Sequence, residues 1–198
     1  RRQRQMCIRD SLSFVLVFHA LITYGSILSF FKLSPIIFFR KLREVLLFAF
    51  STSSSSATMP LTLKTVKEKL GVDQSVASFC IPLGATINMD GTAIMQGIAT
   101  VFIAQAYGVD LQITDYLMVI LTATLASVGT AGVPGVGLIM LAMVLQQVGL
   151  PIEGIALIIG VDRLLDMIRT AVNVSGDSMI ACIISSTQGS LNKSKFFD

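Results

Sequence analysis

The sequence predicts an all-α integral membrane protein, and three observations support this fold class. Hydrophobic residues make up 53% and charged residues 14% of the 198 residues, against about 25% charged residues in an ordinary soluble domain. Mean hydropathy is +0.76. No Lys or Arg occurs between Leu70 and Asp162, although a soluble surface of that length would need bases. The third observation is a polar stripe on an apolar helix.

This stripe lies between residues 155 and 184, where the polar side chains are spaced 4, 3, 4 and 4 residues apart. At 3.6 residues per turn they fall within an arc of roughly 80°. One charge inside a bilayer costs about 3 kcal/mol, so several on one face need partners. Acids and a base together predict a site for charged cargo, and hence a transporter. The stripe consists of Asp162, Asp166, Arg169, Asn173 and Asp177.

The first apolar run, residues 12–31, is about twenty residues long and can span a hydrocarbon core of ~30 Å. It contains His19, which we expect to be a packed or lipid-edge residue. The chain starts with Arg and shows no signal-peptide cleavage site, so we expect a fragment of a longer membrane protein. Residues 1–11 are interpreted as a non-native or flanking lead.

Residues 34–70 predict a first re-entrant hairpin. Two helical arms, each shorter than a full span, flank a serine-rich break at residues 51–56. Irregular backbone at membrane depth is tolerated only against protein or a water-filled cavity. The alternative is a serine-rich loop between two surface helices.

Residues 76–107 predict a broken transmembrane helix, interrupted at residues 88–92 by Asn-Met-Asp-Gly-Thr. Asn, Asp and Gly are poor helix formers, so we expect the helix to unwind there. Freed backbone carbonyls are hard oxygen ligands that suit a small cation. The alternative is a loop that joins two separate short helices.

Residues 115–149 predict a second hairpin, whose tip at residues 129–135 is too rich in Gly and Pro to be helical. The striped helix, residues 151–188, follows it. The order is therefore hairpin, broken helix, hairpin, striped helix. Each half has an odd number of crossings, so the two halves form an inverted repeat, a plan known from secondary transporters.

Charge placement predicts the orientation. The links at residues 108–115 and 151–154 carry acids only, whereas one end of each predicted half carries bases. By the positive-inside rule the basic side, with the C-terminus, is cytoplasmic in a multi-pass protein of the cell (inner or plasma) membrane. The arginines of residues 1–11 break the rule, either because this lead is not native or because the chain is a genuine exception. The bases are Lys64, Lys67, Lys69, Lys193 and Lys195.

Four segments, in this order and spacing, resemble the signatures of the glutamate transporter family, the dicarboxylate/amino acid:cation symporters. They are residues 53–56, 88–92, 129–135 and 166–177, and the likeness runs from about residue 12 to 188. The resemblance implies cation-coupled symport by alternating access. It also implies that residues 12–198 are part of a mobile transport domain, and that the full-length protein is a homotrimer in the lipid bilayer.

The resemblance, together with side-chain chemistry, assigns the substrate site. Arg169 carries a planar fork that can bind a substrate carboxylate at two points, and Asp166 can receive the substrate ammonium. The implied substrate-binding residues are Ser55, Thr92, Val133, Asp166, Arg169, Thr170 and Asn173.

The same resemblance assigns cation sites and no enzymatic cofactor. A first cation would bind backbone oxygens of Gly84, Asn88 and Asn173 with the Asp177 carboxylate. A second would bind Thr86 and the tip carbonyls near Ser127, Val128 and Thr130. Asp90 would belong to a third.

Under this resemblance, a few positions indicate the class of substrate and the coupling ion. Members for neutral amino acids lack the arginine at position 169, and members for plain dicarboxylates lack the acid at 166, so we expect aspartate or glutamate. Gln96 replaces an acid of the potassium- and proton-coupled eukaryotic members, and neither Ser53 nor Met167 is the additional arginine. Potassium countertransport is therefore not expected, and Asp177 favours sodium over protons.

Three alternatives were weighed. A proton-coupled glutamate or C4-dicarboxylate symporter stays open. An ion channel would favour rings of repeated polar residues, which this asymmetric site lacks. An intramembrane enzyme would need a nucleophile beside a base, so we expect no enzyme. The net charge of +3, given its placement, does not indicate nucleic-acid binding.

Overall fold

The computed structural model describes residues 2–198, with side chains from Met6 onward. Within this part of the chain every regular element is a helix, which confirms the all-α prediction. By length and composition, two helices can cross a membrane, Met6–Phe30 and Ile159–Thr187.

The first apolar run forms one helical column in three pieces. These are α1 (Arg2–Phe18), a π-helical segment η1 (His19–Tyr24) and α2 (Gly25–Phe30). π-helical turns are rare and occur mostly at functional sites. The column begins before residue 12, so residues 2–11 continue the same helix. Their non-native origin stays a prediction, and Arg1 lies outside the described residues.

Hairpin 1 consists of α3 (Pro35–Thr52) and α4 (Ser55–Glu68). Its tip is shorter than the predicted break at residues 51–56, because only Ser53 and Ser54 lie outside the helices. Ser53 adopts a left-handed conformation with φ of 52°. Ser54 then caps α4, its hydroxyl accepting a 3.1 Å hydrogen bond from the Ala57 amide.

The broken helix consists of α5 (Gln74–Ile87) and α6 (Asp90–Tyr107). The predicted unwinding at residues 88–92 is too long, since only Asn88 and Met89 lie outside a helix. Asp90 starts α6 instead, because its carboxylate accepts a 3.0 Å bond from the Gly91 amide. An acid in the first turn also interacts favourably with the helix dipole.

Hairpin 2 consists of α7 (Ile113–Ser127) and α8 (Val136–Gln147), joined by a glycine-rich tip. A 3₁₀-helix, η2 (Ile152–Leu157), comes next, so the striped helix α9 (Ile159–Thr187) begins later than residue 151. A last short helix, α10 (Lys193–Phe197), was not predicted.

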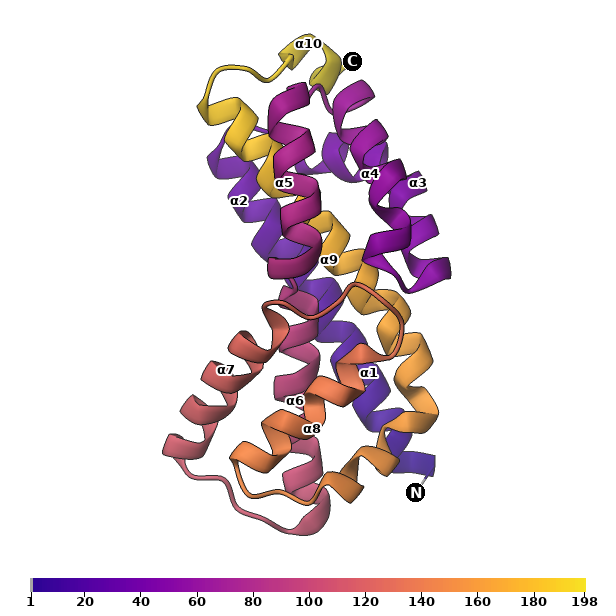
Figure 1. The fold of residues 1–198 in the computed structure, drawn as a ribbon, viewed down its shortest axis with the longest axis vertical. Coiled ribbons are helices and arrows are strands. Elements are labelled where there is room, and N and C mark those ends of the chain that lie inside the picture. The colour runs from indigo at the N-terminus through magenta and orange to yellow at the C-terminus, as the bar shows by residue number, and fades with distance from the viewer. Residues whose placement is uncertain (1) are drawn as a thin grey trace.

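The two hairpins enter from opposite ends of an elongated molecule (Figure 1). Hairpin 1 lies in the half that also holds α5 and the C-terminus, and hairpin 2 lies with α6 in the half that holds the N-terminus. Helix α9 runs through both halves, and the hairpin tips meet beside its middle. The opposed hairpins are the arrangement that an inverted repeat requires.

The C-terminal segment after α9 packs under the base of hairpin 1. Phe196 is fully buried in the main hydrophobic core. The Asn192 amide donates a 2.8 Å bond to the carbonyl of Gly71. Lys41 on α3 donates to the carbonyl of Lys69, at 3.1 Å, and to that of Lys195. This contact gathers the bases of hairpin 1 and of the C-terminus at one end of the molecule.

Candidate functional site

A small cavity lies where the two hairpin tips meet α9 and the break between α5 and α6. Its volume is about 10 Å³, close to the minimum that holds one water molecule. Six of the seven predicted substrate residues line it, and Asp166 lies beside it. The lining residues are Ser53, Ser55, Met89, Thr92, Thr130, Ala131, Gly132, Val133, Arg169, Thr170 and Asn173.

Arg169 and Asp166 form a buried ion pair, as their spacing of three residues on α9 allows. Arg169 is 5% and Asp166 is 2% exposed. The other carboxylate oxygen, Asp166 Oδ2, accepts a 2.9 Å bond from the Gly135 amide at the start of α8. The carboxylate therefore links the arginine to hairpin 2.

The arginine is only partly satisfied by this pair. Among the described residues, its buried Nε and Nη1 atoms find no acceptor. Leaving buried donors unpaired costs about 1–3 kcal/mol each, and more for charged groups. The side chain also lies beside the N-terminal turn of α8, where the helix dipole disfavours a cation. Asp166 thus satisfies only one nitrogen of the guanidinium, and the oxygen atoms of an anionic ligand would supply acceptors for the others.

Neutral groups hold the rest of the site. The Asn173 Oδ1 atom accepts a 2.9 Å bond from the Gly91 amide, and its Nδ2 atom donates to the Thr92 hydroxyl at 3.2 Å. These bonds fix the beginning of α6 against α9. Thr170 donates to the backbone carbonyl of Asp166 at 2.8 Å, which leaves its hydroxyl oxygen able to accept.

Three residues predicted for the first cation site, Gly84, Asn88 and Asp177, lie close together. The Asp177 carboxylate accepts a 3.0 Å bond from Asn88 Nδ2. It also lies so close to Gly84 that no side chain would fit at that position. Asp177 is 3% exposed. The Asp177 carboxylate therefore lies against Gly84 of α5 and Asn88 at the helix break, and the Gly84 carbonyl accepts a 2.8 Å bond from the Asn88 amide.

Backbone hydrogen bonds join the residues that were predicted for the second cation site. The Gly129 amide donates a 2.7 Å bond to the carbonyl of Thr86, and the Thr130 amide donates to the carbonyl of Ser127 at 3.3 Å. Val128 lies between Ser127 and Gly129 in the chain. Among the described residues no cluster of three or more His, Cys, Asp or Glu could hold a metal, so any cation here would rest mostly on neutral oxygens.

Asp90, predicted for a third cation, bonds to the first helical column. Its Oδ2 atom interacts with His19 Nε2 at 2.9 Å and accepts a hydrogen bond from the Tyr24 hydroxyl. Tyr24 also donates to the carbonyl of Val172 at 3.4 Å. Sequence reasoning missed these partners, because a π-helical register that turns His19 and Tyr24 toward one carboxylate leaves no pattern in the sequence.

Hydrogen bonds hold the hairpin tips together. The Ser54 hydroxyl donates to the carbonyl of Gly132 at 2.7 Å, and the Ser56 amide donates to the same oxygen at 3.1 Å. The lack of a side chain at Gly132 permits this contact, since a Cβ atom there would lie 3.0 Å from atoms of Ser55 and Ser56. Sequence reasoning did not identify Gly132 as a contact residue.

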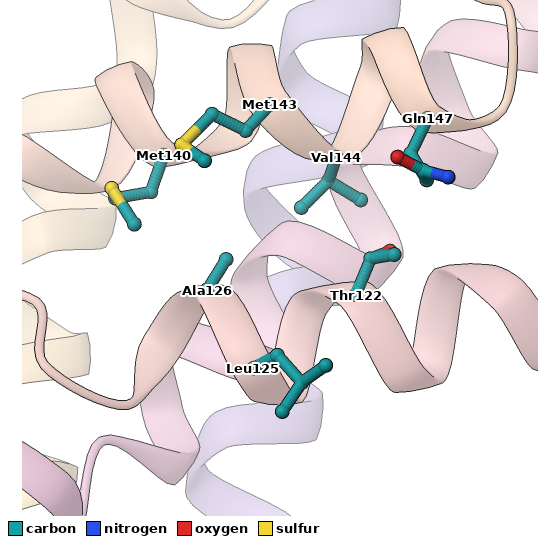
Figure 2. A pocket seen from close by; sticks show the side chains of 7 residues that line it. All are labelled: Thr122, Leu125, Ala126, Met140, Met143, Val144 and Gln147. Atoms are coloured by element: carbon teal, nitrogen blue, oxygen red, sulfur yellow. The ribbon is translucent and has the colours of Figure 1, made fainter.

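The two arms of hairpin 2 pack against each other through a small cluster of buried side chains. An open groove of about 280 Å³ runs beside this contact between α7 and α8. Figure 2 shows Val144 of α8 facing the small side chains Ala126 and Thr122 of α7. The buried apolar residues of α7 form a satellite cluster with Val144, apart from the main core.

The model of the sodium:dicarboxylate symporter family matches residues 11–187. An excitatory amino acid transporter of Caenorhabditis elegans is 50% identical over 153 residues, 77% of this chain and 30% of that protein. Excitatory amino acid transporter 5 of Homo sapiens is 47% identical over 153 residues, 77% of this chain and 27% of that protein.

A bacterial protein is similar over more of the chain. The proton/sodium-glutamate symport protein of Geobacillus stearothermophilus is 39% identical over 180 residues, 91% of this chain and 42% of that protein. The chain thus spans less than half the length of each of these relatives.

Proposed function

Because the chain belongs to the sodium:dicarboxylate symporter family, we propose that the full-length protein is a secondary active transporter. It carries an acidic amino acid, aspartate or glutamate, together with a cation, by alternating access. The chain contributes most of the mobile transport domain, residues 12–198, with re-entrant hairpins at residues 34–70 and 115–149.

The observation that supports this function best is the under-satisfied Arg169 beside the cavity. Its unpaired Nε and Nη1 atoms are charged donors on two edges of the guanidinium, and either can donate a charge-assisted hydrogen bond to a substrate carboxylate. The N-terminal turn of α8 lies on the same side and also favours an anion. Both groups are buried between the hairpin tips, where water does not compete.

An acidic amino acid suits this site better than a plain dicarboxylate, through an exchange of ion pairs. When a substrate carboxylate takes Arg169, Asp166 loses its partner. Removing one partner of a buried pair costs about 3–5 kcal/mol. A substrate ammonium can replace the arginine at Asp166, whereas a C4-dicarboxylate has no cation to offer. Thr92, Thr170 and Asn173 bind the remaining polar atoms.

Sodium is the proposed coupling ion. The groups around Asp177 and around Thr86 combine carbonyl oxygens with a single carboxylate, which suits a hard cation. Gln96, fully buried with an unpartnered amide among the described residues, offers no acid to carry a proton. Proton coupling is the second candidate, because the bacterial relative is named for both protons and sodium.

Hairpin 2 is the proposed gate. The cavity of about 10 Å³ is too small for an amino acid, so at least one tip must move. Hairpin 1 packs its apolar residues into the main core, whereas α7 packs only in the satellite cluster. The arm α7 therefore has less packing to lose than α8, whose Leu141 and Leu145 lie in the main core. Ser55 and Val133 are the tip residues that close over the substrate.

The basic end of the molecule defines the proposed orientation. Hairpin 1 and the C-terminus share that end, so both lie on the cytoplasmic side of the cell membrane. Full-length protein forms a homotrimer, as the resemblance implies. An ion channel is disfavoured, because one base among acids on one helix face is a binding site rather than a ring.

Uptake into proteoliposomes tests this function. Full-length protein should accumulate labelled aspartate under an inward sodium gradient at constant pH. Succinate should compete weakly and neutral amino acids not at all. Uptake driven equally well by a pH gradient without sodium would contradict sodium coupling. Conduction of ions without substrate accumulation would favour a channel.

A further inference from the structure

Gly137 lies directly against the guanidinium of Arg169. It is the second residue of α8, and it is buried. A Cβ atom built at this position would overlap Arg169 Nη1 and would also meet Cζ and Nη2. The planar head group therefore occupies the space that any larger residue would fill with its side chain.

Backbone geometry does not explain this glycine. Its φ is not among the positive values found at Gly129 and Gly135, the two glycines that shape the tip. Inside a helix, glycine is about 1 kcal/mol less favourable than alanine. Local helix propensity thus disfavours glycine at position 137, and the space taken by Arg169 is the physical reason that remains.

We propose that Gly137 is a specificity-determining position, which lets the Arg169 fork lie where it can bind the second carboxylate of an acidic substrate. This inference rests on the proposed function. A methyl group at position 137 displaces the flexible end of Arg169 rather than the backbone. The fork and its pair with Asp166 then lose their geometry, while Thr170 and Asn173 keep theirs. The affinity for acidic substrates therefore falls selectively.

The test is Gly137→Ala in the full-length protein, with Gly97→Ala as the matched control. Gly97 is a helical glycine on α6, and nothing lies within 4 Å of a Cβ built there. We expect the aspartate affinity of Gly137→Ala to fall about tenfold or more, while Gly97→Ala keeps the parent value. Binding of sodium alone, measured by thermal shift, should be unchanged in both variants.

A double-mutant cycle with Arg169→Cys identifies the cause. Once the guanidinium is gone, Gly137→Ala should have no further effect on the binding of a neutral amino acid. The same substitution should lower the melting temperature in the parent and raise it in the Arg169→Cys background, where only helix propensity acts. This second readout does not depend on transport.

Two results would overturn the inference while leaving the proposed function intact. One is an aspartate affinity in Gly137→Ala within about twofold of the parent, combined with a large loss in Arg169→Cys. The other is a loss of binding affinity on Gly137→Ala that is as large in the Arg169→Cys background, measured with a neutral amino acid, as it is for aspartate in the parent. Unchanged aspartate affinity in Arg169→Cys itself would overturn both proposals.

Discussion

The hydroxyl of Ser54, at the tip of hairpin 1, donates a 2.7 Å hydrogen bond to the carbonyl of Gly132, at the tip of hairpin 2. The bond joins two segments that lie 78 positions apart in the chain. It joins the tips beside the cavity that Arg169 lines, and under the proposed gating it has to break when hairpin 2 opens. The state of the gate can therefore be measured at the tips.

Val133 provides a probe of that state. It is 43% exposed and lines the cavity. A cysteine placed at Val133 in an otherwise cysteine-free full-length protein should react with an impermeant thiol reagent added outside. Substrate plus sodium should slow this reaction, because bound substrate holds the tip against the site, and sodium alone should not. Equal labelling with and without substrate would mean that hairpin 2 is not the lid.

Removing the bond between the tips should loosen the gate. Ser54→Ala deletes the hydroxyl that donates to Gly132 and that also caps α4. It therefore costs about 1 kcal/mol for the bond between the tips and about 1 kcal/mol for the helix cap. Labelling of the Val133 cysteine without substrate should become faster in this background. Ser51→Ala is the control, because its exposed hydroxyl donates only to the carbonyl of Phe48 on its own helix.

Cation coupling is tested at Asp177. Asp177→Asn keeps the size of the side chain and an oxygen that can accept from Asn88, but it removes the charge that balances a bound cation. The dependence of substrate affinity on sodium concentration should flatten, since cation and substrate binding are linked reciprocally. A sodium titration identical to that of the parent would mean that the cation site lies elsewhere or that protons drive transport.

The buried Phe196 makes the C-terminal segment part of the folded domain. Phe196→Ala should destabilise the protein by about 3–5 kcal/mol, as expected for truncating a buried aromatic side chain. The neighbouring Phe197 is 45% exposed, so Phe197→Ala should change stability by less than about 0.5 kcal/mol. Thermal unfolding in detergent distinguishes the two variants, and equal melting temperatures would contradict the docking of α10.

The bond between Tyr24 and Asp90 is tested by Tyr24→Phe. Hydrogen bonds to charged groups contribute about 1.5–3 kcal/mol, so this variant should unfold at a lower temperature than the parent. Tyr116→Phe, at an exposed position on α7, is the control. A Tyr24→Phe protein as stable as the control would mean that Asp90 is held by other groups.

Much of the fold was predictable, because hydropathy and Gly, Pro or Ser clusters mark helices and their breaks. The residues at which the helix breaks begin and end were not predictable. Ser54 and Asp90 use their side chains to start helices, which shortens the break predicted at residues 51–56 and the one predicted at 88–92. Helix α10 was missed because five residues carry too little periodicity to be recognised.

The cavity residues were predicted from motif resemblance, and the structure brings six of them together. Their contacts were less predictable. The Asp166–Arg169 pair follows from a spacing of three residues on one helix. The partners of Asp90, and the contact of Gly137 with Arg169, depend on how distant helices pack. A single sequence does not contain that information.

The most direct test of the central claim is the aspartate affinity of Arg169→Cys in the full-length protein. The account predicts that binding and uptake of aspartate and glutamate are abolished, because the fork for the second carboxylate is gone. Neutral amino acids should then compete for the site. An Arg169→Cys protein that binds aspartate as tightly as the parent would contradict the claim that Arg169 recognises an acidic substrate.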